Sequence, residues 1–241
     1  MTRFFIFLTA IVAATAIGCK KDRLEDPNCS LNVITPSFGA ATNLYYNSEG
    51  KLISIKFNDL NTSFEYKGDS IIVIKKQGPD FDRKWSYKMN SDGLPIALKK
   101  DYNAAGTQFE RHVFEYEGTE IKKITITTSS SSTIVIVLNH TWKNGNLISQ
   151  PNGLGVTYTY EYYDELPSTV GDIHYLETII NQDPVYLIRN KNMVKKITET
   201  TSLGSSSRQY EYSFDKNGKV SAVKRIDPVS PFHYDLQYKC D

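Results

Sequence analysis

The sequence predicts an all-β protein: an antiparallel meander of about sixteen strands built from hairpin repeats. The chain has 16 Tyr and 11 Phe among 241 residues, and aromatic residues fit the pleated surface of a strand. Turn signals recur at a mean spacing of 24 residues, since seven intervals cover the 168 residues from position 50 to position 218. Beyond the first 18 residues, no segment shows a sustained helical period of apolar residues.

The first 18 residues have the pattern of an export signal. A basic start ends at Arg3, and Phe4 to Ile17 is uncharged and mostly apolar. A run of this length suits a signal-peptide core and is too short to cross a bilayer as a helix. Gly18-Cys19 follows directly and, with Ala16 where leucine is usual, resembles the lipobox of bacterial lipoproteins. The resemblance implies cleavage before Cys19 and lipidation of this cysteine; an ordinary secretory signal is the alternative.

Residues 19–30 are expected to form the lipidated cysteine and a tether, and residues 31–241 a single antiparallel β domain. Lys20 to Asp26 is a charged run without glycine or proline, as a tether requires. The resemblance implies a lipid-anchored protein of the outer membrane, on either its periplasmic or its surface side. Contact with the membrane would be through the acyl chains only.

Two further cysteines, Cys29 and Cys240, lie at the two ends of the predicted β domain. In an oxidising envelope such a pair predicts a disulfide, with two unpaired thiols as the alternative. Closing about two hundred residues would stabilise the fold by roughly 4–5 kcal/mol in the chain-entropy model. The chain has no C-x-x-C pattern and no histidine close to either cysteine in sequence, so no metal is expected here.

The repeated unit is an aromatic strand, a turn, and a return strand rich in Ile, Val and Lys. It is clearest where Tyr210, Tyr212 and Phe214 alternate with polar residues before Asn217-Gly218. Asn-Gly and Asp-Gly supply the positive φ that tight hairpin turns need. The turn markers fall at 50, 68, 93, 118, 145, 167, 192 and 218, and those at 164–167 and 189–192 lack glycine. The apolar run Ile134 to Leu138 is expected to be buried on both faces.

Adjacent cations in the return strands bear on where the sheet can lie. They are Lys75-Lys76, Lys99-Lys100, Lys122-Lys123, Lys195-Lys196 and Lys224-Arg225. Neighbouring strand residues point to opposite faces, so a spanning barrel would expose one cation of each pair to lipid at roughly 2–4 kcal/mol. The sequence therefore predicts a domain outside the bilayer. Sixteen strands should curl into an open or flattened barrel-like sheet, with a two-layer sandwich as the alternative.

The residues carry no catalytic, metal or cofactor signature. The four histidines lack metal-ligand spacing, and there is no G-x-S-x-G or phosphate loop. Without the leader the chain has 27 basic and 27 acidic residues, so nucleic acid is not an expected partner. Glutamates beside tyrosines are expected to pair with lysines across strands; they are Glu65, Glu115, Glu161 and Glu211.

Tyr158, Tyr160 and Tyr162 belong to the densest tyrosine cluster of the chain. On a concave wall these rings could stack on the sugar rings of a glycan. A role in the hydrophobic core is the alternative, because strand aromatics commonly pack inward.

Two family resemblances accompany this interpretation. The pattern aromatic-x-aromatic, polar residues, Gly-Lys-Val over 210–223 is similar to the YD repeats of RHS-type proteins. The order of lipobox, charged tether and hairpins resembles a Bacteroidota lipoprotein family, a domain of unknown function with a porin-like β fold. The resemblance implies a curved meander and no particular activity. We therefore expect a non-enzymatic binding or scaffold module for a glycan or an envelope protein; a carboxylate-based envelope hydrolase acting on glycans is the alternative.

Overall fold

The computed structural model describes residues 29–181, 188–226 and 232–240, which form seventeen strands and one helix. The leader, Cys19 and the expected tether as far as residue 28 lie outside the described residues. Residues 29 and 30, which were expected to belong to the tether, are instead the start of the first strand of the β domain. The helix is α1 (Ile173–Ile180). The strands are β1 (Cys29–Pro36), β2 (Thr42–Tyr46), β3 (Leu52–Phe57), β4 (Leu60–Lys67), β5 (Ser70–Gln77), β6 (Asp80–Met89), β7 (Pro95–Asp101), β8 (Phe109–Glu117), β9 (Glu120–Thr128), β10 (Ser131–Asn139), β11 (Thr141–Lys143), β12 (Asn146–Pro151), β13 (Thr157–Pro167), β14 (Asn192–Thr201), β15 (Gly204–Phe214), β16 (Val220–Ile226) and β17 (Phe232–Cys240).

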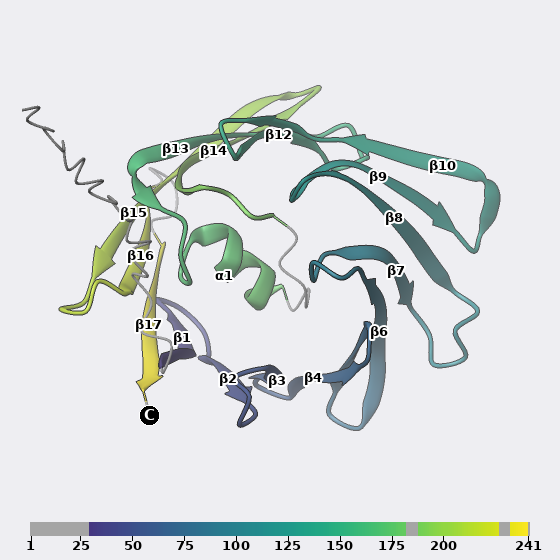
Figure 1. The fold of residues 1–241 in the computed structure, drawn as a ribbon, viewed down its shortest axis with the longest axis horizontal. Helices are drawn as coiled ribbons and strands as arrows, with labels where there is room; N and C mark the ends of the chain where they lie inside the picture. The colour runs from purple at the N-terminus through teal and green to yellow at the C-terminus, as the bar shows by residue number, and fades with distance from the viewer. Residues whose placement is uncertain (1–28, 182–187, 227–231, 241) are drawn as a thin grey trace, which may run out of the picture.

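The strands form one nearly closed, barrel-shaped antiparallel sheet (Figure 1). Sequence neighbours pair from β1 to β10 and from β11 to β17, and β1 also pairs with β17. At the remaining corner, β10 runs through His140 into β11, so that β10 pairs with β9 while β11 pairs with β12. The predicted meander and barrel-like curl are confirmed, and the two-layer sandwich is not observed.

The glycine turns lie where the sequence predicts them. The glycines at 50, 68, 93, 118, 145 and 218 all have positive φ. The two turns predicted without glycine are wrong. Asp164 to Pro167 is the end of β13, and Arg189 to Asn192 leads into β14. The chain between them leaves the wall and forms α1 inside the barrel (Figure 1).

Helix α1 was not predicted because its eight residues are too few to show a sustained helical period. Its side chains Ile173, His174, Leu176 and Ile179 are all buried, whereas Glu177 and Thr178 are partly exposed. Its start is fixed by Asp172, whose carboxylate accepts the N–H of His174 at 2.8 Å. The helix fills part of a lumen that wall side chains alone would leave open.

An aromatic residue near the end of a strand has a repeated structural role. In six strands, five of them followed by a hairpin turn and the sixth being β13, its side chain donates a hydrogen bond to a backbone carbonyl within the first three residues of a preceding strand. The pairs are Tyr46–Leu31, Tyr66–Leu52, Tyr116–Pro95, Trp142–Ile121, Tyr162–Leu147 and Tyr212–Val194, at 2.5–2.9 Å. The aromatic repeat in the sequence is thus tied to the hydrogen bonding of the barrel wall.

The outer face is mainly polar, with one correction to the predicted burial. Val135 and Val137 alternate with inward-facing Leu138 on β10 and are about half exposed, at 52% and 48%. The expectation that the run Ile134 to Leu138 is buried on both faces is therefore wrong for its described residues. A sheet closed into a ring has a solvent side, and no second layer covers β10 there (Figure 1).

Candidate ligand-binding lumen

The segment that leads into α1 is fixed by a close approach at Gly171. Its φ is +100°, and a Cβ there would lie 2.8 Å from Val220 Cβ and 3.0 Å from Leu236 Cδ1. Only glycine fits this backbone and this space without displacing its neighbours. The start of α1 is therefore held directly against β16 and β17.

Asp172 is fully buried and ties α1 to the wall through two backbone donors. One carboxylate oxygen accepts the N–H of His174, and the other accepts the N–H of Val194 on β14 at 3.0 Å. Burial raises the pKa of Asp172 to about 7, against the opposing effect of these two hydrogen bonds. The cause is the loss of water around the charged form.

His174 extends this buried network to Asn190. Its Nδ1 lies 2.8 Å from Asn190 Nδ2, and Asn190 Oδ1 accepts the N–H of Leu147 at 2.9 Å. Burial lowers the pKa of His174 to about 4, so the ring is neutral at pH 7. The network holds α1 in place, and a neutral imidazole satisfies the amide donor of Asn190.

The three tyrosines singled out by the sequence lie on this inner wall. Tyr160 is 8% exposed, meets His174 edge-on at 4.6 Å between ring centroids, and accepts a hydrogen bond from Gln150. Tyr158 and Tyr162 are half-buried against the hydrophobic core. An open sugar platform needs exposed ring faces, whereas this packing favours the core role.

A cavity of about 240 Å³ lies in the lumen near the C-terminal end of α1. Inward side chains of β6 to β9 form most of its wall, and the rest comes from Thr178 of α1, Gln150 of β12, His140 and Ile188. Apolar wall residues are Tyr87, Leu98, Phe114, Ile121, Ile124 and Ile188; the cationic or histidine residues are Lys100, His112 and His140. Apolar walls with a few convergent polar groups are typical of small-molecule sites.

Two polar groups at this cavity bear on what it can bind. His140 is 9% exposed and its Nδ1 has no hydrogen-bond partner in the described protein. Burial lowers the pKa of His140, so its ring is neutral at pH 7. Lys100 lies over the Trp85 ring at 5.9 Å and brings a positive charge to the same wall.

Glu110 and His112 form an acid–histidine pair on β8, with Oε2 and Nε2 3.2 Å apart. Burial acts to raise the pKa of Glu110, but hydrogen bonds from Tyr102 and His112, together with the charge of Lys100, outweigh it and lower the pKa. The glutamate is therefore ionised and holds the imidazole in one orientation. This pair stabilises the polar side of the cavity.

These residues escaped the sequence prediction because each was judged alone. His112 and Phe114 stand two apart in a strand and therefore share a face, and Lys100 is one member of a doublet whose other member points outward. A period of two applied to the polar residues would have placed His112 and Lys100 inside. The closure of the sheet into a barrel decides which strands line the same cavity. The alternation of residues in the sequence does not show this.

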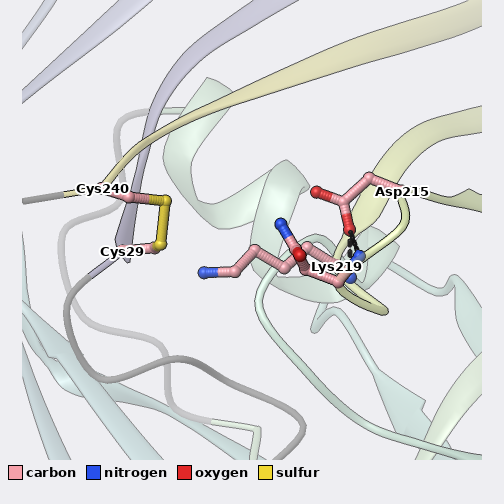
Figure 2. Close-up of a disulfide and its surroundings, with 5 residues drawn as sticks. Cys29, Asp215, Lys219 and Cys240 are labelled. Atoms are coloured by element: carbon pink, nitrogen blue, oxygen red, sulfur yellow. Dashed lines mark hydrogen bonds between the residues drawn. A yellow bond between two sulfur atoms is a disulfide. The ribbon is translucent and has the colours of Figure 1, made fainter.

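The predicted disulfide is confirmed: Cys29 and Cys240 are bonded and join β1 to β17 (Figure 2). In the described ranges no group of three or more His, Cys, Asp or Glu could hold a metal ion. Among the same residues no helix is long and apolar enough to cross a membrane.

The comparisons with known proteins agree with this architecture. No protein-family model and no curated protein matches the chain. Among solved structures, the chain is similar to a porin-like protein from Bacteroides uniformis, at 15% identity and a TM-score of 0.59, covering 88% of this chain and 96% of that one. It is also similar to a porin-like protein from Bacteroides vulgatus, at 14% identity and a TM-score of 0.54, covering 87% and 98%. At these identities the likeness establishes the fold alone.

Proposed function

We propose that this protein is a lipid-anchored envelope protein that binds a small, largely apolar molecule inside its barrel and does not conduct solutes. The observation that carries the proposal is the arrangement of the lumen. Helix α1 occupies part of it, and the remaining cavity of about 240 Å³ has apolar walls with Lys100 and His140. An acidic or acceptor group of a ligand would suit the ammonium group of Lys100, and a donor group would suit Nδ1 of neutral His140, which has no partner among the described residues.

The outer face supports a barrel surrounded by water. Glu115 pairs with Lys123 at 2.5 Å and Glu161 with Lys196 at 2.9 Å, in each case across neighbouring strands as the sequence predicts. Glu65 instead pairs with Lys67 of its own strand. Charges on a lipid-facing wall would each cost roughly 2–4 kcal/mol near the midplane. Attachment through acyl chains on Cys19 would account for an envelope location without insertion of the barrel.

The anchor is tested by expression in a bacterium with lipoprotein processing. Metabolic labelling with an alkyne fatty acid should tag the wild-type chain and leave Cys19→Ser untagged. A wild-type chain that carries no label would remove the lipid anchor from the proposal.

Ligand binding is tested with the full-length protein extracted in mild detergent. Ligand-observed NMR against a fragment mixture should find binders with one polar group on an apolar skeleton. Lys100→Met should weaken those carrying an acidic or acceptor group at least tenfold. Lys76→Met, a change at an exposed position of β5, is the matched control and should bind as the wild type does. Equal binding by all three proteins would place the site elsewhere.

The hydrolase alternative has one observation in its favour, the Glu110–His112 pair beside the cavity. Such a pair can move a proton. Incubation with envelope glycans, followed by mass spectrometry of the products, tests this alternative. Cleavage by the wild type and its loss in Glu110→Gln would favour an enzyme over a binding module.

A further inference from the structure

A second cavity lies at the other end of α1 and contains a buried lysine. Lys219 directly precedes β16, the return strand of the β15–β16 hairpin, and is only 5% exposed. In the part of the chain that the structure describes, no carboxylate forms an ion pair with its ammonium group. Buried lysines are rare without a partner, because removing an ammonium group from water is costly.

The acidic residue nearest in sequence is already engaged elsewhere. One Asp215 carboxylate oxygen accepts the N–H of Asn217 at 2.8 Å and the N–H of Lys219 at 2.9 Å, which closes the hairpin turn. Figure 2 shows the Lys219 side chain extending away from Asp215 and toward the Cys29–Cys240 disulfide. The ammonium group lies 5.2 Å from the centroid of the Tyr238 ring. The turn therefore aims the cation into the barrel and leaves the carboxylate at the turn.

The space in front of Lys219 is a cavity of about 130 Å³. Its wall combines the three tyrosines Tyr46, Tyr175 and Tyr238 with apolar Leu31 and Val170 and the hydroxyl residues Ser30 and Thr169; Cys29 also lines it. The hydroxyl groups of Tyr46 and Tyr238 donate to Leu31 O and Val170 O. Since each water needs about 10–15 Å³, the cavity has room for on the order of ten water-sized atoms.

We infer that this cavity is a binding site for a small organic carboxylate, whose negative charge lies against Lys219. Among the described residues that line the cavity, only Lys219 is charged, and a singly charged anion compensates its ammonium group. The tyrosine rings with Leu31 and Val170 offer apolar contact to a carbon skeleton, and the hydroxyl group of Ser30 can donate a hydrogen bond. This site is separate from the lumen cavity at Lys100, since the two draw their walls from different strands and from opposite ends of α1.

The site is tested on the full-length protein by thermal unfolding with acetate, lactate and benzoate at constant ionic strength and pH 7.5. Each carboxylate should raise the midpoint by several degrees in a saturable manner, as binding to the native state requires. Sodium chloride and inorganic phosphate are the comparison anions. If the carboxylates raise the unfolding midpoint no more than chloride does, the inference is overturned. If phosphate raises the midpoint as much as the carboxylates do, the assignment of the ligand as a carboxylate is overturned.

Lys219→Met keeps an unbranched side chain one atom shorter than lysine and removes the charge. The fold of the variant is checked by circular dichroism. Titration calorimetry should show carboxylate affinity at least tenfold weaker than in the wild type. Lys216→Met, an exposed position on the same turn, should bind as the wild type does. Unchanged affinity in Lys219→Met would overturn the inference, whether or not that variant is more stable.

Asp241, which follows Cys240 in the sequence, offers a carboxylate of the chain itself, so Asp241→Ala is included. Acetate binding by this variant, with none by the wild type, would overturn a free ligand in favour of an internal one. Equal binding by both proteins supports the free carboxylate.

Discussion

Single tyrosine hydroxyl groups contribute to the stability of the barrel wall through hydrogen bonds to backbone carbonyls. Tyr116 Oη donates to Pro95 O at 2.8 Å, so Tyr116→Phe leaves that carbonyl without its donor. We expect a loss of about 1 kcal/mol in the free energy of unfolding, measured by urea titration. Tyr45→Phe, at an exposed outward ring, should change it by less than about 0.5 kcal/mol. Equal effects of the two changes would contradict a role for the inward hydroxyl.

Asp172 and His174 give the fold two opposing dependences on pH. Asp172 has a pKa raised from 3.8 to about 7, so the folded state retains a proton that the unfolded state loses, and this group destabilises the fold as pH rises through that range. His174 has a pKa lowered from 6.5 to about 4. The unfolded state then binds the extra proton, and this group destabilises the fold as pH falls from 6.5 to 4.

His174→Gln should remove the second of these effects. Relative to the variant, the wild type should lose stability as pH falls from 6.5 to 4, by up to about 1.4 kcal/mol per pH unit. Urea titrations at half-unit steps measure the difference, with His233→Gln on β17 as the control. A wild-type-minus-variant difference that stays flat over this window would show that His174 titrates normally.

At the scale of elements, the attachment of α1 depends on the glycine before it. Gly171→Ala places a Cβ 2.8 Å from Val220 Cβ at a φ of +100°. We expect a loss of about 2–4 kcal/mol in unfolding free energy, from strain and overpacking together. Gly155→Ala, at φ +78° with nothing within 4 Å, isolates the backbone cost and should lose only about 1 kcal/mol. A similar loss in both variants would mean that the close packing at Gly171 does not matter.

The strands could be predicted from sequence and α1 could not, for a physical reason. A strand is predicted by the alternation of apolar and polar residues and by the glycine of the turn that follows it, as at Asn217-Gly218. The helix has only eight residues, about two turns, so its apolar positions cannot show a sustained helical period. Its one local signal is the capping residue Asp172. The turns expected at 164–167 and 189–192 failed because they assumed an uninterrupted meander.

At the scale of the whole molecule, the disulfide links the first and last strands. Cys29 and Cys240 are 211 residues apart and join β1 to β17. The double change Cys29→Ala and Cys240→Ala should lower the unfolding free energy by up to about 4–5 kcal/mol, because the unfolded chain gains freedom. Urea titration of both proteins measures it. A double variant as stable as the wild type would show that the β1–β17 ladder alone holds the ends together.

The number of strands and their curl followed from the sequence, but the contents of the barrel did not. About sixteen strands imply a lumen wider than side chains can fill, and the sequence therefore favoured an open or flattened shape. The ring closes more fully because α1 fills part of the lumen (Figure 1). The candidate site depends on that helix, since α1 separates the lumen cavity at Lys100 from the cavity at Lys219.

A ligand bound in the lumen would lie beside Lys100, His112 and His140. Two-dimensional NMR of full-length protein with ¹⁵N-labelled histidine tests this placement most directly, using the strongest binder from the fragment mixture. We expect saturable shifts of the ring signals of His112 and His140, with the signal of His233 unchanged. Binding that leaves the signals of His112 and His140 unmoved would contradict a ligand site in the lumen.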